Sequence, residues 1–157
     1  VSAATWAELR SSMAVHTEQR TLPFTPEQIF DLVADVERYP DFLPLWHSAS
    51  TSRSEQDGTL YFTEQTLQLG PVRKTFRTET SMQRPDRIQI TSTDPLFDEF
   101  VIQWLLEALP EHYCRVDFSL RCKVSSLLLS PIIEMVLGEA AQGIVTAFER
   151  RAHSMYG

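Results

Sequence analysis

The C-terminal quarter of the chain constrains the fold most, because Ser130–Tyr156 predicts one long helix. Ser130 is a favourable N-cap, and Pro131 follows at the first helical position, where its missing N–H costs nothing. Side chains then recur at steps of three and four along one stripe: Ile133, Leu137, Ala140, Ile144, Phe148, Arg151 and Met155. At 1.5 Å per residue this helix is roughly 40 Å long, enough to cross the face of a small sheet. We expect the upstream residues to form that sheet.

A strand and a short helix open the chain. Met13–Leu22 mixes β-forming and polar residues and predicts the first strand. Thr25-Pro26-Glu27-Gln28 then predicts a helix start, with Thr25 as N-cap and Gln28 completing a capping box. The helix should end between residues 35 and 38, because Pro40 disfavours a helical conformation at the residue before it.

Six further strands are predicted between turn signals such as Asp57-Gly58 and Gly70-Pro71. They are Ser48–Ser54, Thr59–Leu69, Val72–Met82, Arg87–Thr93, Phe100–Leu109 and Tyr113–Val124. The fifth is apolar at nearly every position, so we expect cover on both of its faces; the sixth alternates apolar and polar residues. The fold class is α+β, with a twisted antiparallel sheet wrapped around one C-terminal helix.

Length and composition indicate one soluble domain. The chain has 157 residues, 43% of them hydrophobic, and lacks any apolar run long enough to span a bilayer. Its net charge of −7 makes it a poor general binder of nucleic acid or anionic lipid. We assign residues 1–12 as an N-terminal extension and 13–157 as the domain. The extension is either the tail of a transit peptide or an ordinary extension, and Met13 is a candidate initiator.

Two cysteines, Cys114 and Cys122, lie eight residues apart in the last predicted strand. That spacing puts them on one face but roughly 26 Å apart, which excludes a disulfide between them. Buried free thiols are typical of a reducing compartment.

A proline-rich apolar loop, Tyr39–Trp46, holds two prolines and five large apolar or aromatic residues. It either plugs one end of the core or forms a mobile lid over a ligand entrance, or a tip that touches a membrane. Leu127–Leu129 is a second candidate for contact with a bilayer.

The inner strand faces are half polar, which raises the question of a cavity. Phe76 and Met82 mark the inner face of one strand, yet Lys74, Thr78 and Thr80 share it. The preceding strand places Tyr61, Thr63, Gln65, Leu67 and Leu69 together. Either these polar atoms bond locally, or a cavity with water or a polar-headed ligand satisfies them. Gly138 and Gly143, inside the long helix, indicate either a cavity or a close approach of helix to sheet.

Catalytic and metal-binding patterns are weak. The four histidines lack metal-ligand spacing, and no phosphate loop or nucleophile motif is present. Asp94, Asp98 and Glu99 could act as acid–base carboxylates but are better explained as a solvated loop. Trp46-His47 could meet a ligand but is better explained as a packed indole beside a surface histidine. Arg115, Arg121 and Lys123 form an outward basic row that suits solvent or an anionic partner. We predict no catalytic residue, no metal and no catalytic cofactor.

Several ordered motifs resemble the coenzyme Q-binding proteins of the START-like, polyketide cyclase superfamily, which include bacterial ribosome association toxins. The opening match runs LPFTPEQIF from Leu22 to Phe30 and VADVERYPDFLP from Val33 to Pro44. Further matches are DPLF at Asp94–Phe97 with Trp104, CRVDF at Cys114–Phe118, and AFERRA at Ala147–Ala152 with Tyr156-Gly157. The chain departs from the family pattern at Leu45-Trp46-His47, at Asp94–Phe97 and at residues 123–126.

The resemblance implies a helix-grip fold with an apolar tunnel and a non-catalytic role in binding ubiquinone for respiration or quinone biosynthesis. The expected ligand-binding residues are Phe30, Val33, Tyr39, Pro40, Phe42, Leu43, Pro44, Trp46, Phe76, Phe97, Trp104, Phe118, Val136, Ala140, Ile144 and Phe148. Expected partners are an isoprenoid quinone, respiratory or quinone-biosynthesis proteins and a transient membrane surface, but not DNA. The location would be the bacterial cytoplasm or inner-membrane periphery, or the matrix side of the mitochondrial inner membrane. Alternatives are a ribosome-directed inhibitor of subunit association and, less favoured, a cyclase-type enzyme.

Overall fold

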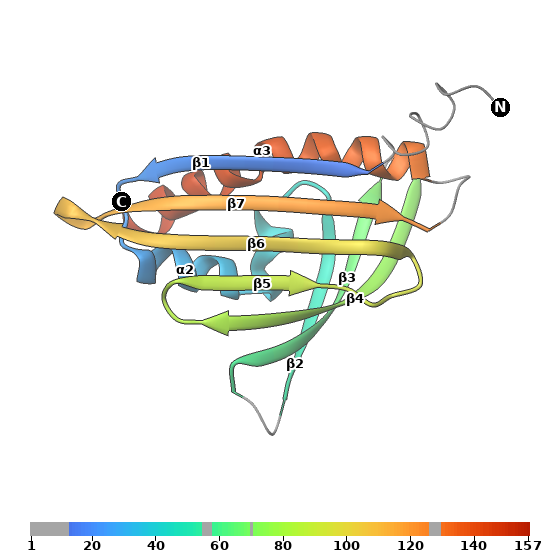
Figure 1. Ribbon diagram of the computed structural model, residues 1–157, viewed down its shortest axis with the longest axis horizontal. Helices are drawn as coiled ribbons and strands as arrows, with labels where there is room; N and C mark the ends of the chain where they lie inside the picture. The colour runs from blue at the N-terminus through green and yellow to red at the C-terminus, as the bar shows by residue number, and fades with distance from the viewer. Residues whose placement is uncertain (1–12, 55–57, 70, 126–129) are drawn as a thin grey trace.

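A computed structural model describes residues 13–54, 58–69, 71–125 and 130–157. One sheet and two α-helices make up the fold (Figure 1). The strands are β1 (Ala14–Leu22), β2 (Trp46–Arg53), β3 (Leu60–Leu69), β4 (Val72–Gln83), β5 (Arg87–Thr91), β6 (Phe97–Leu109) and β7 (Tyr113–Val124). The helices are α2 (Pro26–Ala34) and α3 (Ser130–Tyr156), with 3-10 turns η1 (Val36–Asp41) and η2 (Pro110–His112).

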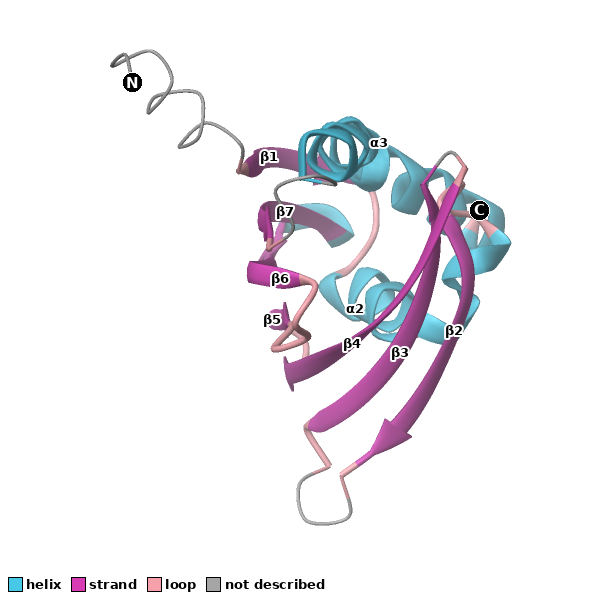
Figure 2. Cartoon of the chain, turned by 90° about the vertical axis from the view of Figure 1, so that its right-hand side faces the viewer, coloured by secondary structure: helices cyan, strands magenta, loops and turns pink. Residues whose placement is uncertain are grey.

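All neighbouring strands are antiparallel, in the order β1-β7-β6-β5-β4-β3-β2. The sheet curls strongly, so β2, β3 and β4 turn around the side on which both helices lie (Figure 2). This confirms the predicted α+β fold with a curved antiparallel sheet around a C-terminal helix.

The predicted strands are found with small shifts in their ends. β7 has the predicted bounds, and its apolar row from Cys114 to Val124 is buried at every second position. The prediction for the fifth strand is wrong in one respect. β6 begins earlier, at Phe97, and its outer face is open, with Leu105 41% exposed. The sequence is apolar there, but no element of the described chain packs on the convex side.

The start of α2 confirms the capping box. Thr25 Oγ1 accepts a hydrogen bond from Gln28 N at 3.2 Å, and Gln28 Oε1 accepts one from Thr25 N at 2.9 Å. The helix ends at Ala34, and Val36–Asp41 continues as a 3-10 turn rather than as the loop that the prolines predicted. The turn directs the following residues toward α3.

α3 has the predicted length, but it lies along β1 and β7 rather than across the sheet (Figure 1). Its buried stripe also differs from the predicted one. Ala140, Arg151 and Met155 were predicted in the stripe but are not buried. Ala141, Val145 and Ala152 were not predicted in it but are buried. The steps of three and four fit the buried row of α3 and also a second row on another side of the helix. The predicted stripe therefore combined residues from both rows. The side chain of Ser130, the predicted N-cap, and the Leu127–Leu129 run lie outside the described residues.

Both cysteines are buried free thiols, as the spacing in β7 predicted. Burial raises the pKa of Cys114 to about 11 and that of Cys122 to about 12, because a thiolate would lose its hydration there. Nearby Glu134 and Glu99 add to the rise at Cys122.

Candidate functional site

A groove of about 740 Å³ runs between α3 and the segment that joins η1 to β2. One wall comes from that segment: Phe42, Leu43, Pro44, Leu45 and Trp46. The other wall comes from α3: Val136, Glu139, Ala140, Gly143, Ile144, Thr146, Ala147, Arg150, Arg151 and Ser154. The proline-rich segment is therefore a wall of a groove as well as part of the core.

Hydrogen bonds and ring contacts of a buried tyrosine, Tyr39, connect the first wall to α2 and α3. Tyr39 is 4% exposed, and its hydroxyl donates to the carbonyl oxygen of Val33 at the end of α2. Its own carbonyl accepts from Leu43 N at 2.8 Å. Phe148 of α3 packs edge-on against Tyr39, Phe42 and Trp104, with centroids 5.4, 5.1 and 5.0 Å away. The groove is thus supported by a packed aromatic cluster.

Small residues shape the second wall. A Cβ added at Gly143 or at Gly138 would meet no atom within 4 Å, leaving aside the helix backbone itself. The alternative that these glycines allow a close approach of helix to sheet is therefore wrong. Gly143, Ala140 and Ala147 face the groove, whereas Ala141 is fully buried on the other side of the helix.

One end of the groove is cationic. Arg150 and Arg151 line it without an ion pair or hydrogen bond to any described residue. The neighbouring carboxylate is directed elsewhere, since Glu149 pairs with Arg20 of β1 at 3.3 Å. The Arg151 guanidinium lies over the Phe42 ring, 5.2 Å from its centroid. The groove therefore has an apolar centre and a positive end.

Behind the groove wall, the concave face of β3 and β4 carries buried polar side chains. Trp46 Nε1 donates to Gln65 Oε1 at 2.7 Å, and Gln65 Nε2 donates to Thr78 Oγ1 at 2.9 Å. Thr63 and Thr80 are each 1% exposed, and the Thr63 hydroxyl lacks a hydrogen-bond partner among the described residues. The Thr80 hydroxyl acts on the Tyr61 phenol, where it lowers the pKa that burial raises, and the phenol itself donates to Ala34 O. Local bonding therefore satisfies only part of this polar surface.

The structure brings together seven of the sixteen predicted ligand-binding residues. Those in the groove are Phe42, Leu43, Pro44, Trp46, Val136, Ala140 and Ile144. The others lie outside its walls: Phe30, Val33, Tyr39, Pro40, Phe76, Phe97, Trp104, Phe118 and Phe148. All of these except Pro40 belong to the buried core. Their role as ligand contacts stays a prediction.

Sequence reasoning missed the polar and cationic lining of the groove. Glu139, Thr146, Arg150, Arg151 and Ser154 were left out of the expected site. Their spacing along one helical face, beside the small residues, is the signal that could have identified them.

The candidate carboxylates do not form an acid–base pair. Asp94 accepts from Leu96 N at 2.9 Å and so closes a turn, and Glu99 pairs with Arg121 at 3.0 Å. In the described part of the chain, no cluster of three or more metal-ligating side chains occurs. No helix among the same residues combines the length and apolarity needed to cross a membrane.

The chain is similar in sequence to two named proteins over most of its length. It is 32% identical over 146 residues to the ribosome association toxin RatA of Pseudomonas aeruginosa, covering 92% of this chain and all of the toxin. It is 30% identical over 156 residues to the mitochondrial coenzyme Q-binding protein COQ10 homolog B of Xenopus laevis. That match covers 95% of this chain but only 62% of the Xenopus protein.

The fold is shared with an aromatase/cyclase. The crystal structure of the Zhui aromatase/cyclase from Streptomyces sp. R1128 superposes with a TM-score of 0.76, covering 90% of this chain and 94% of that one. At 12% identity this likeness concerns the fold alone. The profile of a family described as polyketide cyclase / dehydrase and lipid transport matches residues 22–149. The chain therefore belongs to this START-like family, whose members related to it include coenzyme Q-binding proteins and ribosome association toxins.

Proposed function

We propose that the protein is a non-catalytic lipid-binding protein that takes ubiquinone in the groove between α3 and Phe42–Trp46. The observation that carries the proposal is the groove itself. Its volume of about 740 Å³ lies within the usual range of small-molecule sites, and its lining is mainly apolar with a few polar groups. The likeness to the coenzyme Q-binding protein supports the identity of the ligand.

The shape of the groove suits an isoprenoid tail. Its lining runs along α3 from Val136 to Ser154, which is roughly 27 Å of helix. Small side chains at Ala140, Gly143 and Ala147 leave room for an extended chain beside the helix. In this role the protein would meet a membrane surface briefly and serve respiratory or quinone-biosynthesis proteins. It would work in a bacterial cytoplasm or on the matrix side of the mitochondrial inner membrane.

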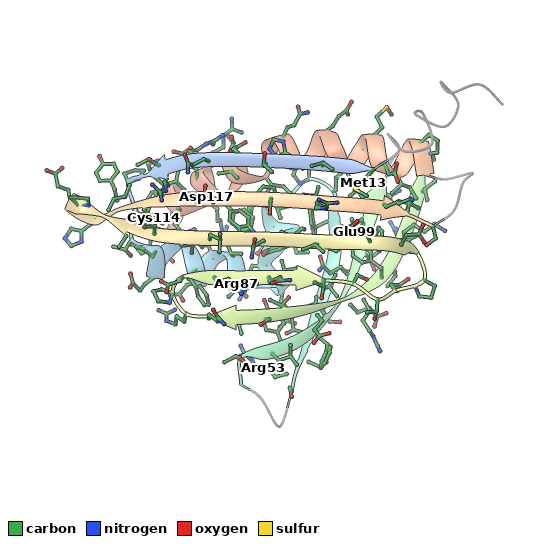
Figure 3. All side chains as sticks on the ribbon, in the orientation of Figure 1. Met13, Arg53, Arg87, Glu99, Cys114 and Asp117 are labelled. Carbon is green, nitrogen blue, oxygen red and sulfur yellow. The ribbon has the colours of Figure 1, made fainter. Side chains whose placement is uncertain are left out.

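A ribosome-directed role is the second candidate. It is supported by 32% identity over the whole length of a ribosome association toxin. The charge distribution weighs against direct binding to rRNA, because phosphate neutralisation needs free cations. The net charge is −7, and the row of β7 that the sequence marked as basic is largely neutralised. There Arg121 pairs with Glu99, which Figure 3 labels on β6, and Arg115 pairs with Glu107.

Native mass spectrometry tests the first candidate. The protein would be purified from a quinone-producing host, weighed intact and then extracted with solvent. We expect a stoichiometric adduct whose mass matches a ubiquinone. A mass that stays that of the bare chain after added ubiquinone would contradict the proposal.

Sedimentation tests the second candidate. Purified protein would be added to ribosomal subunits under conditions that favour their association. A ribosome-directed inhibitor would lower the fraction of joined particles, whereas an unchanged profile would remove this candidate.

A further inference from the structure

A strip of buried polar side chains, which we call the polar strip, lies on the concave face of β3 and β4. It consists of Thr63, Gln65, Thr78 and Thr80, each no more than 5% exposed. Thr63 pairs directly with Thr78, and Thr80 pairs with Tyr61 one step further along the same face. The strip is therefore continuous across two strands, and it sits within an otherwise apolar core.

Hydrogen bonding within the polar strip is incomplete. The Gln65 amide uses both its ends, toward Trp46 and Thr78. The Thr63 hydroxyl finds no partner among the described residues, and the Thr80 hydroxyl has at most the Tyr61 phenol beside it. Because an unpaired buried hydroxyl destabilises a fold, these two groups indicate a partner from outside the chain.

Trp46 connects the polar strip to the groove. Its side chain lines the groove, and its indole N–H is held by Gln65 at 2.7 Å. In the sheet Trp46 pairs with Leu67 of β3. Gln65 and Thr63 lie on the same face of β3 as Leu67, two and four residues before it. A rotation of the indole would break this hydrogen bond and free Gln65 Oε1.

The surroundings of the polar strip disfavour a charged group of a ligand. Glu134 is the one buried charged side chain in the described part of the chain, and its Oε1 accepts from Val124 N at the end of β7. A carboxylate or phosphate placed against the strip would lose its hydration, and the cation that shares this face of β4, Lys74, lies beyond Phe76 and is only half-buried. Arg150 and Arg151, which form no ion pair with a described residue, lie instead at the C-terminal end of the groove on α3.

We propose that the polar strip is the head-group subsite of the groove and takes an uncharged ring bearing carbonyl oxygens, such as a quinone. Trp46 turns aside to admit the ring, Thr63 and Thr80 donate their hydroxyls to its oxygens, and the tail stays along α3. The inference rests on the proposed function and specifies the end of the ligand that enters the protein.

Thr63→Val and Thr80→Val test the subsite, because valine keeps the shape and removes the hydroxyl. The probe is ubiquinone with a two-isoprene tail, titrated by quenching of tryptophan fluorescence, with oleate as an anionic comparison. We expect each variant to bind the quinone about tenfold or more weakly, as the loss of a hydrogen bond predicts. The unliganded variants should have urea midpoints equal to or above that of the wild type.

Controls separate the subsite from general damage. Thr75→Val changes the same strand on its exposed face, where Thr75 bonds Thr66, and should leave affinity unchanged. Thr63→Ser keeps a hydroxyl and should retain binding. Equal quinone affinity in wild type and both valine variants would overturn the subsite while the proposed function stands. Equal weakening of oleate would overturn the selection for an uncharged head. No quinone binding by the wild type would overturn the proposed function and the subsite together.

Discussion

Tyr39 and Tyr61 place their phenols inside the protein, where both donate to carbonyl groups at the C-terminal end of α2. Tyr39 donates to Val33 O, and Tyr61 donates to Ala34 O at 2.8 Å. Carbonyls of a last helical turn lack partners within the helix, so these two bonds satisfy groups that would otherwise be buried and unpaired. Burial raises the pKa of Tyr61 to about 12 and holds that of Tyr39 well above its ordinary value.

Stability should therefore fall as the pH rises above that ordinary value of 10.0. The unfolded chain loses phenol protons there, while the folded chain keeps them, so the free energy of unfolding decreases with pH. Urea unfolding between about pH 9 and about pH 11 measures the slope. The double variant Tyr39→Phe/Tyr61→Phe should show a shallower decrease, and an equal slope in both proteins would contradict the assignment.

Cys114 and Cys122 should be inert in the folded protein. Their pKa values of about 11 and about 12 leave almost no thiolate near neutral pH, and both side chains are inaccessible. Iodoacetamide at pH 8 should label neither thiol until urea unfolds the chain, as mass spectrometry can count. Rapid labelling of the native protein would show that β7 opens locally.

At the scale of the element, the capping box sets the start of α2 and therefore the course of η1 and the groove wall. Replacing Thr25 by Ala removes the hydroxyl that Gln28 N donates to. We expect a loss of about 1 kcal/mol in the free energy of unfolding, measured by urea titration. Thr25→Ser keeps the hydroxyl and should cost much less, so an equal loss in both variants would locate the effect in packing.

α3 offers a matched pair of glycines for testing the groove. Each has open space around its Cα, but only Gly143 lines the groove. Alanine at either position should stabilise the protein by roughly 0.5–1 kcal/mol, because glycine is unfavourable inside a helix. Gly143→Leu should also fill the groove and abolish the ubiquinone adduct in native mass spectrometry. Gly138→Leu should leave the adduct in place, and an adduct that persists in Gly143→Leu would exclude this groove as the binding site.

At the scale of the whole molecule, we expect the sheet and α3 to form the domain without residues 1–12. β1 starts at Ala14 and pairs with β7 along its full length. The family match also starts downstream, at residue 22. We expect removal of residues 1–12 to leave the thermal midpoint unchanged, as differential scanning calorimetry can measure. A clearly lower midpoint would show that the domain extends into these residues.

Local patterns in the chain were sufficient to predict most elements. Alternation along Tyr113–Val124 predicted both the bounds of β7 and its buried face. Thr25, Pro26 and Gln28 carry short-range capping chemistry, so the start of α2 could be read directly. The half-polar inner faces of β3 and β4 were also visible, because strand periodicity assigns a face to every residue.

Tertiary structure alone decided which apolar residues form the groove and which fill the core. α3 has two apolar rows, and the choice of buried row depends on the curl of the sheet, which brings β1 and β7 to one side of the helix and Phe42–Trp46 to the other. The sequence by itself determined most elements and the buried faces of strands such as β7, since those follow from local periodicity. The buried hydroxyls of Thr63 and Thr80 and the position of Arg150 and Arg151 in the groove depend on long-range packing, so only the folded chain could reveal them.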